Sequence, residues 1–450
     1  MKRGISLLTI ALAALTLGTA AFAQTLTITC RCIADGVNNN TVRWIEEVVI
    51  PGFEAQHDGV NVELAQFGGT DEALKEQYAL DLSVGGGADV MSFDGFWVPE
   101  FVAGGLLEPL SAAGGESASS WEGWEHIPDG LEELLSYDGE RYGIALGTDY
   151  RMFFYRKDML EEAGVENADN WQPQSWEEVL DAARAVKETF PDSAPLQINA
   201  GTAMGEATTM QGYFPMLLGT GHFLLDDQGR WIVRSQGILD TLNLYKTIYL
   251  DEELGDARLQ LVQDGRNRSF ANFRDGVTAI LLEGDYFYRG PTAPDQEFAV
   301  ENRDEVMGWA PIPAQEPGEG FRGQDIVTIS GGTGYVVNPN SDNPELAWEL
   351  LAYMNSTESL MGAQEIEPRI RVRDDVPVPD SEYLTETAAE LGQYTTARPN
   401  DPAYPQISYE AQLMTERVVS GEMTPEEAMD AYASAVTDIV GEENVVDQLD

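Results

Sequence analysis

The sequence predicts an α/β protein in which parallel strands are covered by helices, and two observations support this prediction. From residue 26 onward, segments alternate between strand and helix patterns, with strands at 26–32, 60–67 and 89–93 and helices at 42–49 and 70–84. This order implies a parallel sheet, because each helix returns the chain to the same end of the sheet. With 450 residues and 43% hydrophobic content, the chain exceeds what one hydrophobic core usually serves, so we expect two domains.

Turn and capping residues mark the ends of these elements. The first strand alternates apolar and polar residues from Leu26 to Cys32, and a run of turn-forming residues at 35–40 follows it. Thr70 is placed to cap the second helix, and the glycines at 85–87 end that helix before the third strand begins.

Three later helices begin at recognisable signatures. Each signature combines a side chain that can cap the helix with acidic residues or a proline in the first turn. The signatures are Ser175-Trp176-Glu177-Glu178, Asn343-Pro344-Glu345 and Thr424-Pro425-Glu426-Glu427. By contrast, the small and polar residues at 114–120 predict a surface loop.

The first 23 residues have the pattern of a secretory signal peptide. A basic start at Lys2 and Arg3 precedes an apolar run at 5–17, and Ala21-Phe22-Ala23 supplies small residues for cleavage after Ala23. The apolar run is shorter than the ~20 residues that a membrane span needs. No cysteine stands at the cleavage position, so we expect export to the periplasm or the outside of the cell without a lipid anchor.

The chain is strongly acidic. It has 77 acidic and 26 basic residues, a formal net charge of −51 at pH 7. Repulsion at this charge argues against nucleic acid and anionic membrane surfaces as partners. Acidic, lysine-poor surfaces suit high salt, where screening weakens self-repulsion, so we hypothesise a saline habitat. The alternative is an exported protein that is acidic without such adaptation.

The cysteines and histidines do not suggest a metal site or a cofactor. Cys30 and Cys32 project from the same face of a strand, with Cα atoms near the ~7 Å limit for a disulfide, so a bridge and two buried thiols both stay open. The three histidines (His57, His126 and His222) are far apart in the sequence, without zinc-ligand spacing.

Common catalytic motifs are missing from the sequence. It contains no P-loop, no H-E-x-x-H and no G-x-S-x-G, and the glycines at 85–87 precede a strand instead of following one. We therefore expect a non-enzymatic protein. A secreted carbohydrate-active enzyme is the alternative; it would need two carboxylates about 5 to 10 Å apart across the scissile bond.

Aromatic and polar residues gather at the ends of three predicted strands. They occupy 94–97, 148–151 and 284–288. In open α/β sheets, ligands bind outside the carboxyl ends of strands. Aromatic faces stack on sugar rings, and carboxylates and arginine bind hydroxyls, so these clusters indicate a sugar site. Core packing is the alternative for each aromatic residue taken alone.

Four segments also resemble a known family. They are Ala88-Asp89-Val90-Met91 through Leu110, Arg141 through the Phe154–Gly164 block to Glu178, Ala279 to Tyr286, and Gly331 to Met354. Taken in order, they are similar to the extracellular solute-binding proteins of sugar-type ABC importers, the maltose-binding-protein-like family. The resemblance spans the chain from Thr25 nearly to its C-terminus.

The resemblance implies a type II periplasmic-binding-protein fold. In this fold, two lobes, each a mostly parallel sheet flanked by helices, are joined by a hinge that the chain crosses several times. It implies an N-terminal lobe of 24–146 plus 308–356 and a C-terminal lobe of 147–307 plus 357–450. The crossings would fall near 145–148, near 306–310 and just beyond Met354.

The resemblance further implies capture of a mono- or oligosaccharide in the interlobe cleft and delivery to the permease of an ABC importer, by a monomer without a cofactor. Gln211 stands where this family often has a carboxylate. Loop position and chemistry add Asn38, Asn39, Arg369 and Tyr404. The expected ligand-binding residues are Asn38, Asn39, Asp94, Trp97, Asp149, Tyr150, Gln211, Tyr213, Asp285, Tyr286, Gly331, Gly332, Arg369 and Tyr404.

Other ligands and partners stay open on the sequence. A polyamine would exploit the acidity, and a polyol or its phosphate would suit the same fold, although an anion needs several convergent basic residues. The partner could also be a chemoreceptor instead of a permease.

Overall fold

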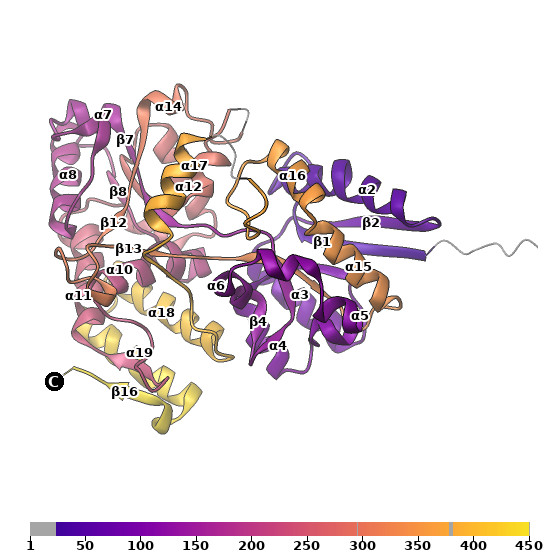
Figure 1. Cartoon of the computed structure of the whole chain (residues 1–450). Helices are drawn as coiled ribbons and strands as arrows, with labels where there is room; N and C mark the ends of the chain where they lie inside the picture. The colour runs from indigo at the N-terminus through magenta and orange to yellow at the C-terminus, as the bar shows by residue number, and fades with distance from the viewer. Residues whose placement is uncertain (1–23, 295, 378–380, 450) are drawn as a thin grey trace, which may run out of the picture.

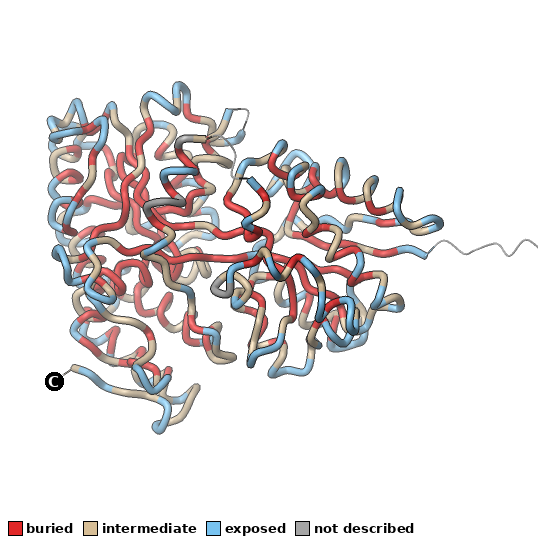
Figure 2. Tube along the Cα trace, in the orientation of Figure 1, coloured by how far each residue is buried: buried red, intermediate tan, exposed pale blue. Residues whose placement is uncertain are grey.

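The computed structural model describes residues 24–294, 296–377 and 381–449, and it forms two α/β lobes between which the chain passes several times (Figure 1). The predicted signal peptide lies outside the described residues. Buried residues form a separate core in each lobe and continue along the crossing segments (Figure 2). No helix within the described ranges has the length and apolar character needed to cross a bilayer.

The N-terminal lobe contains a five-stranded sheet in the order β2-β1-β3-β14-β6. β1 pairs in parallel with both β2 and β3, so the predicted parallel arrangement of the first three strands is confirmed, whereas β14 runs antiparallel to β3 and β6. The strands are β1 (Gln24–Arg31), β2 (Val60–Phe67), β3 (Val90–Asp94), β6 (Gly143–Ala145) and β14 (Thr333–Val337), with a separate hairpin of β4 (Ser136–Tyr137) and β5 (Glu140–Arg141).

Helices surround this sheet. They are α1 (Asn39–Trp44), α2 (Ile50–Gln56), α3 (Asp71–Ser83), α4 (Val98–Ala103), α5 (Leu110–Ser119), α6 (Asp129–Glu132), α15 (Pro344–Met354) and α16 (Thr357–Ile366). A π-helical turn at Ile45–Val49 joins α1 to α2. The hydroxyl of Thr70 accepts the Ala73 amide and caps α3, as the sequence predicts.

The C-terminal lobe contains a four-stranded sheet in the order β11-β7-β10-β8 and a three-stranded sheet, β12-β13-β15. The strands of this lobe are β7 (Arg151–Arg156), β8 (Leu196–Gln197), β10 (Ile280–Gly284), β11 (Met307–Ala310), β12 (Ile312–Pro313), β13 (Ile326–Ile329) and β15 (Thr395–Thr396), with a separate pair of β9 (Trp231–Arg234) and β16 (Val445–Asp447). β7 is antiparallel to both β10 and β11, whereas β10 and β8 are parallel, so this sheet is mixed.

The helices of this lobe are α7 (Lys157–Glu162), α8 (Trp176–Thr189), α9 (Glu206–Thr208), α10 (Phe214–Gly219), α11 (Gln236–Lys246), α12 (Gly265–Arg274), α13 (Tyr286–Arg289), α14 (Arg303–Val306), α17 (Glu382–Leu391), α18 (Tyr404–Val419) and α19 (Pro425–Val440). Thr424 and Glu427 form the predicted capping box of α19. Ser175 caps α8, but the Glu178 carboxylate accepts the Gln174 amide instead of the Ser175 amide. Asn343 precedes α15 without capping it through its side chain.

The loop predicted at 114–120 is wrong, because most of this stretch belongs to α5. Leu110 and Ala118 anchor α5 in the core, and Gly114 faces the Trp348 ring so closely that a Cβ there would collide with it. Gly114 therefore lets α5 and α15 approach each other closely. A kink at Gly115, where φ is 56°, follows the contact.

The structure divides the chain differently from the predicted lobes at two stretches. Residues 308–329, expected in the N-terminal lobe, contribute Ala310, Ile312 and Val327 to the C-terminal core. Residues 357–376, expected in the C-terminal lobe, pack on the N-terminal core, because α16 and the segment after it bury Leu360 and Val372 there. The chain therefore returns to the N-terminal lobe close to residue 331, and it leaves that lobe well beyond Met354.

Cys30 and Cys32 form a disulfide in this structure, with their Cα atoms 5.3 Å apart. β1 ends between them, and the Cys32 amide donates to the Cys30 carbonyl, which bends the backbone and shortens the distance that an extended strand would give. Of the two alternatives left open by the sequence, the structure has the bridge.

Candidate functional site at the lobe boundary

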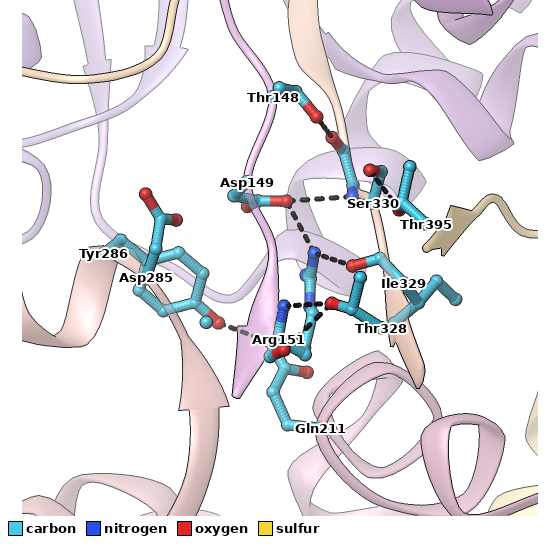
Figure 3. Close-up of polar contacts among 12 residues, drawn as sticks. Thr148, Asp149, Arg151, Gln211, Asp285, Tyr286, Thr328, Ile329, Ser330 and Thr395 are labelled. Carbon is cyan, nitrogen blue, oxygen red and sulfur yellow. Dashed lines mark hydrogen bonds and ion pairs between the residues drawn. The ribbon is translucent and has the colours of Figure 1, made fainter. Parts of the chain in front are cut away.

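Two crossing segments lie side by side where the lobes meet (Figure 3). Asp149, just before β7, accepts two hydrogen bonds on Oδ1, one from the Gly331 amide at 2.8 Å and one from Arg151 Nη1 at 2.5 Å. Arg151 Nη1 also donates to the Ile329 carbonyl at 3.3 Å. A Cβ at position 331 would lie 2.7 Å from Asp149 Oδ1, so only glycine allows this approach.

Burial and hydrogen bonding act in opposite directions on Asp149. Burial raises the pKa of this carboxyl, but Arg151, Arg369 and the Gly331 amide outweigh it and leave the pKa below its usual value. Asp149 is therefore an ionised anchor of the crossing. Thr328 reinforces the same place, because its hydroxyl accepts the Arg151 amide at 2.9 Å and donates to the Arg151 carbonyl at 2.8 Å.

Gln211 and Tyr286 meet on the C-terminal side of the boundary. Gln211 Nε2 donates to the Tyr286 hydroxyl, which in turn donates to Glu283 Oε2 at 2.9 Å. Glu283 is fully buried and forms a bidentate pair with Arg266, at 2.8 and 2.9 Å, which compensates its charge. The π-helical turn Thr209–Tyr213 supplies Gln211, and the end of β10 supplies the carboxylate, so two elements hold this network in place.

A charged cluster links the lobes beside the crossing. Arg289 on α13 binds Asp285 at 3.2 Å and also Glu367, which follows α16 in the other lobe. Glu367 also accepts from Asn40 Nδ2 at 3.2 Å. Burial raises the pKa of Asp285, because it disfavours the charged carboxylate. Burial also lowers the pKa of Arg369, and repulsion from the neighbouring Arg289 lowers it further.

Asp94, at the end of β3, faces the C-terminal lobe. Its Oδ1 binds Arg398 Nη2 at 2.5 Å, and the same guanidinium binds Glu206 Oε1 at 3.4 Å. Glu206 also accepts from Tyr404 at 2.6 Å and from Ser408 at 2.5 Å. Burial raises the pKa of both carboxyls, and Arg398 opposes that rise at each of them.

The structure thus brings several of the expected site residues to one boundary. They are Asp94, Asp149, Gln211, Asp285, Tyr286, Gly331, Arg369 and Tyr404. Asp149 lies within electrostatic range of Asp94, Asp285 and Tyr286, which joins the three groups of contacts into one region.

Other expected residues have structural roles. Trp97 and Tyr213 lie in the cores of the two lobes, so the packing interpretation holds for these aromatics, and Tyr150 is buried near β7 and β10. Asn38 and Asn39 fold the loop after β1: Asn38 donates to the Arg31 carbonyl at 2.7 Å, and Asn39 accepts the Asp35 amide at 2.9 Å.

Gly332 also has a packing role. A Cβ at this position would lie 2.5 Å from Leu134 Cδ1, so the residue permits close contact within the N-terminal lobe. In this structure the neighbouring Gly331 is the glycine whose amide contacts the site.

Sequence reasoning missed most of the arginines at the boundary. Arg151, Arg289 and Arg398 have well-buried side chains, Arg266 is partly exposed, and each of the four binds a carboxylate there. One signal was present, because Arg151 stands inside the predicted cluster at 148–151 and Arg289 directly follows the one at 284–288. Arg151 and Arg289 each stand within four residues of a predicted site residue, whereas nothing local marks Arg398.

Several buried polar atoms at the boundary have no hydrogen-bond partner among the described residues. They include Gln211 Oε1, Asp285 Oδ1, Arg151 Nε and Arg369 Nε. Buried polar groups are normally paired, so unpaired donors and acceptors at the boundary mark a place suited to a ligand or ordered water that can donate and accept.

One group of side chains elsewhere could hold a metal by geometry alone. His126 Nδ1 lies 3.0 Å from Asp374, and Asp375 is close by. Asp375 is already engaged by Arg373 at 2.7 and 2.8 Å, which lowers its pKa to about 2, so this carboxylate already has a cationic partner.

Comparison with known proteins gives a consistent result. The family model described as bacterial extracellular solute-binding protein matches residues 38–361. A solved structure of an ABC transporter solute-binding protein from Thermotoga lettingae, bound with α-D-tagatose, is 28% identical with a TM-score of 0.76, over 93% of this chain and 100% of that one.

Two curated relatives are oligosaccharide-binding proteins by name. The arabinooligosaccharide-binding protein of Halalkalibacterium halodurans is 28% identical over 235 residues, which are 50% of this chain and 46% of that protein. The galactooligosaccharide-binding protein of Bacillus subtilis is 22% identical over 399 residues, which are 85% of this chain and 84% of that protein.

Proposed function

The chain belongs to the family of bacterial extracellular solute-binding proteins, and from this premise we propose that it captures a small carbohydrate between its lobes and delivers it to the permease of an ABC importer. Three similar proteins support the carbohydrate: one is bound with tagatose, and two are named for oligosaccharides. The monosaccharide and oligosaccharide relatives leave the length of the sugar open.

The observation that carries this proposal is the set of orphaned donors and acceptors at the lobe boundary. Gln211 Oε1 and Asp285 Oδ1 accept, and Arg151 Nε and Arg369 Nε donate. A sugar hydroxyl both donates and accepts, so a ring bearing several hydroxyls matches a mixed set better than a purely cationic or anionic ligand does. Tyr286 adds an aromatic face beside Gln211.

We propose that the ligand contacts come from both lobes. Asp94 would contribute from the N-terminal lobe, Gln211 and Tyr286 from the C-terminal lobe, and Asp149 and Gly331 would fix the geometry of the crossing between them. A ligand that touches both lobes has differential affinity for the closed form, so binding shifts the equilibrium toward closure. The closed form would dock on the permease as a monomer.

The sequence and the family together support a proposal for the cellular setting. We propose export through cleavage after Ala23 to the periplasm or the extracellular space, without a lipid anchor. The net charge of −51 supports adaptation to a saline habitat, because screening by salt reduces repulsion among surface carboxylates. The relatives are binding proteins, so we propose that the sugar leaves unchanged and that neither a cofactor nor a metal takes part.

The test is a thermal-shift screen of residues 24–450, in high salt, against mono- and oligosaccharides, polyols, polyol phosphates and polyamines. A ligand at 100 times its dissociation constant stabilises the folded state by about 2.7 kcal/mol, which raises the melting temperature measurably. We expect a shift with one class of neutral sugar and recovery of that sugar intact by chromatography. A shift only with polyamines, or conversion of the sugar, would overturn the proposal.

A further inference from the structure

Arg398 occupies an unusual position between the lobes. It lies on the segment between β15 and α18 of the C-terminal lobe, and its side chain is only 8% exposed. Its guanidinium binds Asp94 of the N-terminal lobe at 2.5 Å and Glu206 of its own lobe at 3.4 Å. One arginine therefore connects carboxylates from both sides of the boundary.

The surroundings hold this guanidinium in place. It lies 4.2 Å above the Phe96 ring, a cation–π contact, and Phe96 packs against the cores of both lobes. Tyr404 and Ser408 orient Glu206 by donating one hydrogen bond to each of its oxygens. On the same segment, Asn400 Nδ2 donates to the Ser136 carbonyl of the N-terminal lobe at 3.0 Å.

The two carboxylates need a cation when the lobes meet. Closure brings Asp94 to Glu206, and two like charges at low exposure disfavour this approach unless a positive charge lies between them. Glu206 and Arg398 stay together when the lobes separate, because both belong to the C-terminal lobe. The Arg398–Asp94 pair, by contrast, joins the two lobes and would break if they separated.

We propose that Arg398 is a latch that favours the closed arrangement of the lobes before any ligand is bound. This inference rests on the proposed function in one respect, namely that the lobes open and close around a solute. Because the apparent affinity scales with the population of the binding-competent form, a latch of this kind sets how tightly the protein holds its sugar without touching it. Arg398 is thus a positioning residue.

The experiment compares small-angle X-ray scattering of the ligand-free wild type with that of Arg398→Gln. The latch predicts a larger radius of gyration for the variant and an affinity for the identified sugar weakened about tenfold or more, as the closed population falls. Arg258→Ala removes an arginine that is 94% exposed and serves as the control, for which neither quantity should change.

A second variant tests the role of charge. Adding Glu206→Gln to Arg398→Gln removes one of the two facing charges while keeping a group that Tyr404 and Ser408 can bond, so the lobes should close again and affinity should recover in part. If Arg398→Gln does not fold, Arg398→Lys, which keeps the charge and loses the second bond, should give an intermediate radius.

Two results would overturn the latch. One is an unchanged ligand-free radius with weakened sugar binding, because Arg398 would then contact the sugar directly. The other is no change in either quantity. If no sugar binds but the ligand-free radii differ as expected, the latch stands and the proposed function fails, so the two failures are distinguishable.

Discussion

Removing the Asp149 carboxylate should destabilise the protein more than removing any exposed acid. In Asp149→Ala, Arg151 stays buried at 6% exposure but loses its only carboxylate partner among the described residues, and the Gly331 amide loses its acceptor. At an effective dielectric constant near 20, two charges about 4 Å apart attract by about 4 kcal/mol. Breaking a buried pair and leaving one charge uncompensated costs about 3 to 5 kcal/mol, and we expect a loss in this range.

The assay is equilibrium unfolding in urea, monitored by tryptophan fluorescence, with the free energy extrapolated to water. Glu47→Ala breaks an exposed pair with Arg43 at 3.1 Å and should cost less than about 1 kcal/mol. Asp149→Asn keeps an acceptor for the Gly331 amide and should lose less than the alanine variant. If Asp149→Ala unfolds within 1 kcal/mol of the wild type, the crossing does not depend on this ion pair and the reasoning is refuted.

Three further predictions concern ligand, pH and salt. Tyr286→Phe removes the hydroxyl that joins Gln211 to Glu283, so sugar affinity by calorimetry should fall about tenfold while Tyr409→Phe, at an exposed site, has no effect. Burial raises the pKa of Asp94, so this carboxyl binds a proton more tightly in the folded protein than in the unfolded chain. Its contribution to the stability of the folded state is therefore present at low pH and is lost as pH rises through the raised pKa. Across a pH series the melting temperature should therefore be higher on the acid side of this raised pKa than above it, and the reverse order would contradict this. Because the net charge is −51, the melting temperature should also rise when NaCl is increased from about 0.1 to 1 M, as the screening length shrinks from about 10 to 3 Å. An unchanged melting temperature would count against salt adaptation.

Local signals in the sequence were sufficient for much of the N-terminal sheet. β1, β2 and β3 follow the predicted strands closely, and Thr70 and Thr424 cap the helices that their positions indicate. These features depend on residues near one another in the chain. Gly114 was misread because its role depends on Trp348, which is far away in the sequence and close in space.

The site was harder to predict for the same reason. Trp97 and Tyr213 have the residue types of a sugar site, but whether an aromatic ring faces a ligand or the core depends on packing that no local pattern records. Asp94 was identified because it ends a strand, whereas its partner Arg398 lies on a loop about 300 residues away. Long-range pairing also explains the lobe boundaries, since residues 308–329 pack with β7 and α10 of the C-terminal lobe and not with β14 of the N-terminal lobe.

The most direct test of the account is a crystal structure of the protein with the sugar that gives the largest thermal shift. The account predicts one sugar held between the lobes, with hydrogen bonds from Asp94 on one side and from Gln211 or Tyr286 on the other. A sugar bound to one lobe alone, or on a surface away from the lobe boundary, would contradict it.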